Sequence, residues 1–464
     1  MKSSQQNIWR SYVLLLIGGI ACIWSLLLLS PETGISSGLH TSMESSLLHD
    51  IEVRLREPLV IFLLQILSIV ALSKFCGILA RRLGQPSVFG EIVAGIVLGP
   101  SLLGALAPEI QQWLFPANTL DSLELLSQLG VLLFLFGIGA ELELAQMRRR
   151  SMQVLMISHA SIILPFALGI GCAYWLYNDY APPGVSFTNF GLFMGIAMSI
   201  TAFPVLVRIL RDRNMTGTEL GDMATTCAAI DDVTAWCLLA GVVAVGQSAS
   251  ALTALVIMAL TVLWSVLLLG FLRKRLQRVQ LDPKKSRSIM VALLLFALLS
   301  ATVTELIGIH ALFGAFLAGA AVAGHSGLRH LVLDRIEPLA LALLLPLFFA
   351  FTGLRMQIGL LDGQDWLVCA GIIAIATAGK FGGASLASRL AGRPWRDSII
   401  LGLLMNTRGL MELVVLNIGY DLGFLSERVF SMMVIMAIVT TFATSPLLAL
   451  MQRRSEHAPQ QTRG

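Results

Sequence analysis

Two adjacent carboxylates stand in the middle of a long apolar segment. Asp231 and Asp232 lie within residues 220–246, which carry few other charges. A charged side chain at the centre of a bilayer costs about 2.5–3.5 kcal/mol on insertion scales, so such residues need a partner or a function. Neighbours on a helix project about 100° apart, so the two acids need not serve one ligand. One of them can face a seam between helices while the other faces a cavity.

Lys380 is the natural counter-ion for one of these acids. It lies inside the apolar segment 366–388, flanked by small residues that permit close helix contact. Pairing Lys380 with Asp231 leaves Asp232 as a titratable carboxylate without a counter-ion. Burial and a like-charged neighbour favour the protonated form of a carboxylate. Asp232 can therefore hold a proton when no cation is bound and release it when a cation binds; a purely stabilising ion cluster is the plainer alternative.

Two other apolar segments contain residues that break a helix. Residues 188–210 include the run SITAFP (199–204), whose proline lacks a backbone donor. Residues 397–420 include the run MNTRG (405–409) seven segments later. Discontinuous helices expose carbonyl oxygens that coordinate Na+ and helix ends whose dipoles tune charge. An ordinary proline kink is the simpler alternative for the first run alone.

A cation site follows if the first break lies beside the acids. Thr201 offers a backbone carbonyl and a hydroxyl close to where we expect Asp232. We therefore predict that Na+ binds at Asp232 and Thr201, with Asp231 and Ser199 also at the ion- and proton-binding site. Such an ion is a transported substrate, and we predict no cofactor.

The remaining intramembrane charges have structural interpretations. Arg408 and Glu412 are spaced i,i+4 and can pair along one helix face. With Asn406 they are expected to neutralise the ends of the discontinuous helix. The roles of Glu91 and His159 stay open, and His159 is not placed in the site because a lone buried histidine is more often satisfied locally.

The composition indicates that lipid is the solvent of this chain. Of its 464 residues, 56% are hydrophobic and 13% are charged, with a mean hydropathy of +0.80. A soluble domain carries about 25% charged residues, and a membrane helix needs about 20 largely apolar ones. The apolar segments are residues 11–29, 58–80, 87–104, 123–141, 151–177, 188–210, 220–246, 250–272, 288–307, 308–324, 338–360, 366–388, 397–420 and 427–451.

The loops between these segments alternate in charge. Lys and Arg gather after every second segment, and the intervening loops hold very few. Because positive loops stay in the cytoplasm, we expect a multi-pass inner (plasma) membrane protein with both termini cytoplasmic. A signal peptide is the alternative for segment 11–29, and we expect the segment to be retained because no small-residue cleavage site follows it. Residues 452–464 are expected to be a short cytoplasmic tail, and no nucleic-acid partner is predicted.

Two pairs of segments resemble each other seven helices apart. Residues 133–141 (LFLFGIGAE) match residues 347–355 (LFFAFTGLR), and residues 90–95 (GEIVAG) match residues 314–319 (GAFLAG). An odd separation reverses the direction of the chain across the membrane, so we expect inverted repeats. Secondary transporters often have this architecture, with the substrate site near the midplane. Similar composition could explain one such pair, and two pairs favour the repeat.

Three runs resemble the monovalent cation–proton antiporters. GQPSVFGEI (84–92) with LGP (98–100) resembles the second helix of that family. ITAFPVL (200–206) and MNTRGLMEL (405–413) resemble the branch that contains the plant cation/H+ exchangers. The resemblance covers roughly residues 55–450. It implies the all-α Na+/H+ exchanger fold, in which a six-helix core moves against a dimerisation domain, in a homodimer.

The resemblance also implies a domain organisation. Residues 1–57 would hold an extra helix and an extracytoplasmic loop, and residues 58–451 the exchanger domain. Within it, core helices would occupy 151–246 and 366–451, dimerisation helices 58–141 and 288–360, and a linker helix 250–272.

The acid pair departs from the plant pattern. The plant exchangers have Asn-Asp where this chain has Asp231-Asp232. The Asp-Asp pair instead resembles the electrogenic bacterial Na+/H+ antiporters, in which the second Asp binds the ion and the first pairs with a lysine. The resemblance thus implies that Asp232 binds the ion and that Asp231 is the partner of Lys380.

These features predict a transporter rather than an enzyme. The leading hypothesis is secondary active exchange of Na+ (or Li+) for H+ by alternating access, serving pH homeostasis. K+/H+ exchange is a close alternative because the signatures are mixed, and a sodium-coupled symporter of an organic anion is a third. An intramembrane aspartyl protease is disfavoured, because adjacent aspartates on one helix diverge and a GxGD motif is missing.

Overall fold

The computed structural model describes residues 53–456 except 84, 142–151, 214, 216, 248–250 and 280–285. Over these residues the chain is helical, without a strand. The predicted segment 11–29 and most of the predicted tail lie outside the described residues. The chain divides into one compact unit that ends at Ala71 and a second from Leu72 to Gly464, and the packing given below is that of the second.

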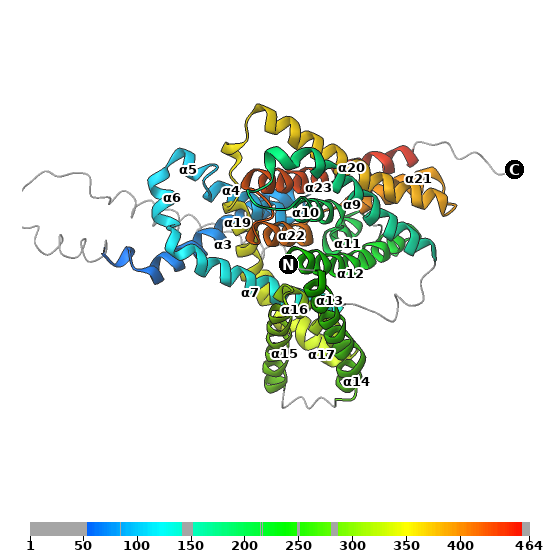
Figure 1. Ribbon diagram of the computed structural model, residues 1–464, viewed down its shortest axis with the longest axis horizontal. Coiled ribbons are helices and arrows are strands. Elements are labelled where there is room, and N and C mark those ends of the chain that lie inside the picture. The colour runs from blue at the N-terminus through cyan, green and yellow to red at the C-terminus, as the bar shows by residue number, and fades with distance from the viewer. Residues whose placement is uncertain are drawn as a thin grey trace, which may run out of the picture. The chain divides into compact units, whose positions relative to one another are not determined.

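Within the described part, ten helices are long and apolar enough to cross a membrane (Figure 1). They are α3 (Pro58–Arg82), the stretch Ser87–Leu106 that begins with α4 (Ser87–Leu98), α7 (Ala117–Glu141), α9 (Met152–Tyr180), α12 (Glu219–Gln247), the stretch Leu252–Leu276 that contains most of α13 (Ala251–Val266) and ends with α14 (Arg273–Leu276), α15 (Ser286–Ile307), the stretch Ser326–Leu360 that contains α19 (Leu345–Leu354), α20 (Gly363–Leu390) and α23 (Glu427–Glu456).

The other three predicted spans are shorter or interrupted. The segment predicted at 308–324 is α16, with only 12 residues (Ala311–Val322). The segment 188–210 is divided into α10 (Phe187–Ser199) and α11 (Phe203–Asp212), and the segment 397–420 into α21 (Trp395–Met405) and α22 (Leu410–Asp421). Both predicted helix breaks are therefore confirmed.

The first break has a local cause in the sequence. Residues 200–202 have extended or non-helical backbone between the two half-helices, and proline 204 stands in the first turn of α11. The N–H groups of a first turn have no partner within the helix, so proline is tolerated there. The proline is therefore compatible with the start of the second half-helix, after α10 has ended at Ser199.

The helices of the second unit form two groups by packing. In the first group, which we call the core bundle, α9 packs on α10, α12 and α20, and α21 to α23 pack against these helices. In the second, the scaffold bundle, α7 packs on α16 and α19, α4 on α19, and α15 on α16. Helix α13 contacts α12 and α15, one from each group. That these groups are a moving core and a dimerisation domain stays a prediction.

Glycines bring the helices of the scaffold bundle into backbone contact. A Cβ built on Gly95 of α4 or on Gly353 of α19 would lie 2.0 or 2.3 Å from a carbonyl oxygen of the other helix. For Gly139 of α7 and Gly319 of α16 the corresponding distances are 2.2 and 2.1 Å. Any side chain at these four positions would force the two helices of each pair apart.

These contacts agree with the inverted repeats. The sequence match relates α4 to α16 and α7 to α19. In the structure, α4 packs on α19 and α16 packs on α7. Replacing each helix by its counterpart in the other repeat turns the first contact into the second. A pseudo-two-fold relation between the repeats requires this pairing.

Candidate ion-binding site

Asp231 is fully buried in α12 and is surrounded by hydrogen-bond donors. Its Oδ1 accepts from the Ser158 hydroxyl at 2.5 Å. Its Oδ2 accepts from the hydroxyls of Ser161 and Thr201, both at 2.8 Å, and lies 3.1 Å from Lys380 Nζ. A buried ion pair is stable only when further hydrogen bonds satisfy its remaining atoms. Asp231 meets that condition, so its charge is neutralised within the protein.

Lys380 is also fully buried and uses three acceptors. Besides Asp231, its ammonium group donates to the carbonyl oxygens of Ser161, at 3.0 Å, and of Ser199. Three N–H donors therefore have three acceptors. Ser199 is the last residue of α10, so the lysine lies at a helix C-terminus, where a positive charge is favoured.

Asp232 has different surroundings although it is the next residue. Its side chain is only 3% exposed, and its Oδ1 has no hydrogen-bond partner within the described part of the chain. The backbone N–H of Phe203, in the first turn of α11, donates to this carboxylate. The positive end of a half-helix thus faces an acid that retains an open acceptor. Of the two carboxylates, only Asp232 offers an oxygen for an added ion.

Thr201 lies where the two helix breaks cross. Its Oγ1 is 2.8 Å from Asp231 Oδ2 and 3.1 Å from the carbonyl oxygen of Met405, in the other break. The next residue, Ala202, donates its N–H to the carbonyl of Thr407 at 3.0 Å. We expected the Thr201 hydroxyl beside Asp232. It points instead to Asp231, the acid that is paired with Lys380.

Arg408 neutralises the end of a half-helix. Its guanidinium is fully buried and donates to the carbonyl oxygens of Ala197 and Met198, near the end of α10, at 3.0 and 2.7 Å. It also lies 3.3 Å from Glu412 Oε1. Asn406 ends α21, and its Oδ1 is buried without a partner among the described residues. The structure therefore brings these three residues to the helix breaks, and Arg408 and Glu412 form the expected i,i+4 pair.

Two residues of this site were not anticipated. Ser158 and Ser161 supply two of the four donors around Asp231, and they lie one turn apart on the same face of α9. Their i,i+3 spacing in an apolar helix was the available signal. His159 between them is exposed and contacts the Leu155 carbonyl at 2.8 Å, so it is outside the site. Ser199 takes part through its carbonyl only, because its hydroxyl donates to Ile196.

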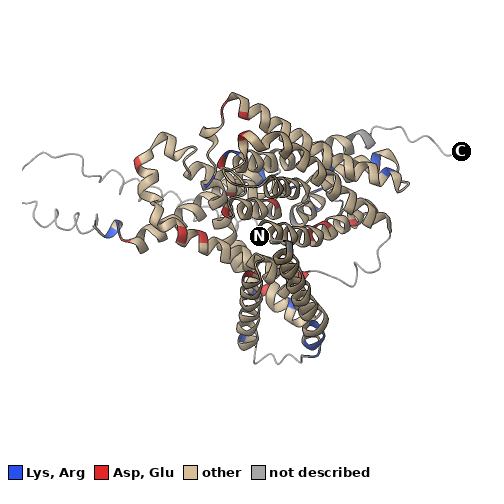
Figure 2. Cartoon of the chain, in the orientation of Figure 1, with Lys and Arg blue, Asp and Glu red and all other residues tan. Residues whose placement is uncertain are grey.

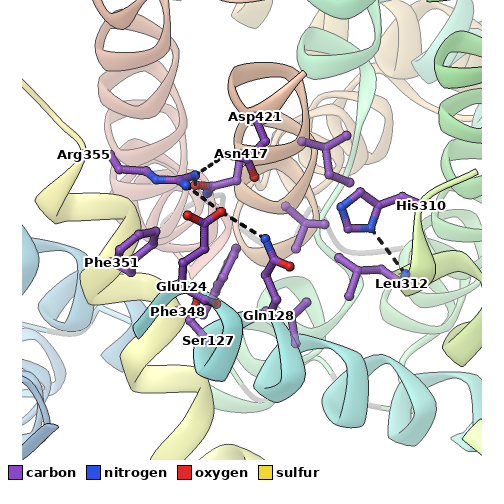
Figure 3. A pocket seen from close by; sticks show the side chains of 13 residues that line it. Glu124, Ser127, Gln128, His310, Leu312, Phe348, Phe351, Arg355, Asn417 and Asp421 are labelled. Atoms are coloured by element: carbon purple, nitrogen blue, oxygen red, sulfur yellow. Dashed lines mark hydrogen bonds and ion pairs between the residues drawn. The ribbon is translucent and has the colours of Figure 1, made fainter. Parts of the chain in front are cut away.

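A second polar cluster joins the two bundles (Figure 3). Arg355, just after α19, lies 2.8 Å from Glu124 of α7 and 2.7 Å from Asp421 of α22. It also donates to Asn417 Oδ1 at 2.9 Å and lies 4.5 Å above the ring of Phe351. These residues line a pocket between scaffold and core helices. We call Arg355, Glu124, Asp421 and Asn417 the bridging cluster.

Comparison with known proteins agrees with this geometry. Residues 68–450 match the family described as sodium/hydrogen exchanger, transmembrane. The Na(+)/H(+) antiporter NhaS4 of Synechocystis sp. is 41% identical over 84% of this chain and 97% of its own. Cation/H(+) antiporter 17 of Arabidopsis thaliana is 40% identical over 85% of this chain and 48% of its own. K(+)/H(+) antiporter 1 of Saccharomyces cerevisiae is 31% identical over 85% and 46%.

A solved structure shares the fold. The sodium proton antiporter MjNhaP1 from Methanocaldococcus jannaschii superposes with a TM-score of 0.59, covering 84% of this chain and 96% of its own, at 13% sequence identity. The predicted fold class and the predicted resemblance are thereby confirmed. The chain is a multi-pass membrane protein of the sodium/hydrogen exchanger family, whose members are cation/proton antiporters, not enzymes, with the ions as their substrates.

Proposed function

We propose that this protein exchanges Na+ (or Li+) for H+, and that the two ions compete for Asp232. The observation that supports this proposal is the contrast between neighbouring acids. Asp231 accepts four donors, whereas Asp232 is buried with an oxygen that has no partner among the described residues. A buried carboxylate of this kind needs a proton or a cation, and one charge at a time satisfies it.

The exchange cycle follows from this competition. When Asp232 holds a proton it is neutral, and the core bundle can then move so that the site opens to the other side of the membrane. When the proton leaves, the carboxylate accepts a cation, and backbone oxygens of the nearby helix break, the Thr201 carbonyl among them, complete its coordination. Because Asp231 is one residue away, a bound cation also weakens the Asp231–Lys380 pair, and Lys380 can then release a second proton. Two protons for one cation would make the exchange electrogenic.

Alternating access requires the core bundle to move against the scaffold bundle. We propose this movement, a homodimer formed through the scaffold helices, and an inner-membrane location with cytoplasmic termini. The Lys and Arg residues support the sidedness, since they gather at the ends of α14 and α15 that border residues 280–285 (Figure 2).

Everted membrane vesicles test the proposal directly. A preformed pH gradient is monitored with a fluorescent dye, and Na+, Li+ or K+ is added. We expect dequenching with Na+ and Li+ in the wild type and none in Asp232→Asn. Asp222→Asn, an exposed acid on the same helix, is the matched control and should keep exchange. Full exchange in Asp232→Asn would overturn the site, and no response to any alkali cation would overturn the function.

K+/H+ exchange is the second candidate. It is supported by the 31% identity to a yeast protein described as a K(+)/H(+) antiporter. The same vesicles compared at equal concentrations of K+ and Na+ decide between the two. Sodium-coupled uptake of an organic anion would instead require solute accumulation that depends on Na+, with no proton movement.

A further inference from the structure

Trp236 is a buried side chain whose polar atom is unused. It lies in α12, is 1% exposed, and its indole Nε1 has no hydrogen-bond partner within the described ranges. Another membrane tryptophan, Trp264, donates its Nε1–H to Ser300 Oγ at 3.2 Å. Buried indole N–H groups usually find an acceptor. The Trp236 N–H therefore requires an explanation.

Trp236 follows Asp232 by four residues on the same helix. Residues at i and i+4 share one face, with Cβ atoms roughly 6 Å apart. This face carries an unpaired acceptor, Asp232 Oδ1, and an unpaired donor, Trp236 Nε1. The two atoms are complementary to a cation that carries a water molecule, because the carboxylate binds the cation and the water accepts from the indole.

The Trp236 ring also contacts the scaffold bundle. The Trp236 ring stacks on Phe316 of α16, with centroids 5.6 Å apart and planes at 27°. Asp231, about 100° away around the helix, is turned to α9 and α20 instead. Trp236 thus contacts the scaffold bundle through its ring, four residues after the open acid on α12.

We propose that Trp236 is a specificity-determining residue of the transport site. Its indole N–H donates to a water molecule that remains on the cation bound at Asp232, so the cation binds partly hydrated. An indole has no acceptor and does not coordinate the cation itself. A water bound to the cation through one lone pair keeps the second for the N–H. This inference rests on the proposed function and adds one residue to it.

The consequence is a preference among cations. Smaller alkali ions hold their water more strongly, so a site that stabilises one water ligand favours Li+ and Na+ over K+. Loss of a single hydrogen bond is expected to raise the half-saturating concentration of Na+ and Li+ about two- to tenfold. The value for K+ should change less.

The test compares variants in the vesicle assay. Trp236→Phe keeps a ring against Phe316 and removes the N–H; we expect the change in half-saturating concentration just described, with the maximal rate within about twofold of wild type. Trp264→Phe, the matched control, should leave both quantities unchanged. Phe316→Leu keeps the N–H and removes the stacked ring, so it should alter the maximal rate and not the half-saturating concentration.

Three results would overturn the proposal. One is a Trp236→Phe variant with wild-type half-saturating concentrations of Na+ and Li+. Another is a variant that loses only its maximal rate, as a purely structural tryptophan would. If Trp236→Phe folds poorly, Trp236→His at pH 8.5 is used instead, because its neutral ring also carries an N–H. The third overturning result is a Trp236→His variant whose affinity falls more than tenfold for Na+, Li+ and K+ alike. Absence of exchange in the wild type would refute the proposed function instead.

Discussion

Neighbouring aspartates in one helix have opposite surroundings here, and their positions around the helix explain why. Asp231 is turned to α9 and α20, where serines and a lysine were available to satisfy it. Asp232 is turned to the N-terminus of a half-helix. The partial positive charge of that terminus attracts the carboxylate but does not neutralise it as a full positive charge would. The pair therefore combines an acid that has a counter-ion with an acid that has none, and the proposed cycle places the exchanged ion on the second.

Removing one member of the buried pair should destabilise the protein. Lys380→Met leaves the Asp231 carboxylate without its counter-ion, and breaking a buried pair in this way costs about 3–5 kcal/mol. We expect a clearly lower melting temperature of the detergent-solubilised protein. Asp232→Asn should melt at or above the wild-type temperature, because it removes a charge that has no such partner.

The matched control is Lys274→Met, an exposed lysine of α14, which should melt like the wild type. The double variant Lys380→Met with Asp231→Asn should recover part of the loss, because neither charge remains. A single Lys380→Met variant with unchanged melting would show that the buried pair contributes nothing to stability.

The sequence singled out the charged residues of the candidate site and not two of its serines, Ser158 and Ser161. Asp231, Asp232 and Lys380 stand out because a charge inside an apolar helix is costly. Ser158 and Ser161 carry no such cost, since a membrane serine can bond its own helix backbone. Which serines donate to Asp231 depends on how α9 rotates against α12, and that is a property of tertiary packing.

The two interrupted helices form one structural element. Their breaks are joined by the Ala202–Thr407 backbone bond and by the contact of Thr201 with Met405. Gly409 stands at the crossing, where a Cβ would lie 2.8 Å from Val205 Cγ2. The runs around positions 204 and 409 predicted the interruptions because they are local. The bonds between the breaks join residues about 200 positions apart and could not be predicted from either run.

The end of one predicted span shows the same limit. The sequence 288–324 reads as two long apolar spans, whereas α15 ends at Ile307 and α16 begins at Ala311 and has 12 residues. Gly308 between them has a φ of +97°, which favours glycine, and His310 caps α16 by accepting from the Leu312 N–H. Hydropathy alone does not predict where a turn and a helix cap of this kind shorten a helix.

Close helix crossings give a prediction at this scale. Gly95→Ala places a Cβ that would lie 2.0 Å from the Ala350 carbonyl oxygen, so α4 and α19 must separate. Overpacking of this kind costs about 1–3 kcal/mol, and we expect a lower melting temperature. Gly371→Ala in α20 is the control, because its Cβ meets no described atom within 4 Å and alanine favours a helix. Equal melting of both variants would contradict the backbone contact.

At the scale of the molecule, the bridging cluster connects groups of helices that the proposed cycle moves apart. Arg355 binds Glu124 of the scaffold bundle and Asp421 of the core bundle at the same time. This arrangement could not be predicted from the sequence, because each of the three residues lies near a helix end, where charges are common. Their meeting depends on the packing of α7, α19 and α22.

The bridging cluster should therefore bias the protein toward the arrangement seen here. Its ion pairs are partly exposed, so each contributes about 1 kcal/mol, or roughly fivefold in population. Asp421→Asn weakens the bond of Arg355 to the core and keeps its pair with Glu124. We expect this variant to separate the bundles more often at the cluster and to expose the pocket that lies between them (Figure 3).

A cysteine in the pocket measures this opening. In a background whose six native cysteines are replaced by alanine, Val414→Cys reports access of a membrane-impermeant maleimide to the pocket. We expect labelling severalfold faster with Asp421→Asn than without it, and only from the side that the Lys and Arg distribution assigns to the exterior. Asp179→Asn, an exposed acid at the end of α9, should leave the rate unchanged. Equal rates with and without Asp421→Asn would mean that the cluster does not hold the bundles together, and labelling from the other side would reverse the orientation of the chain.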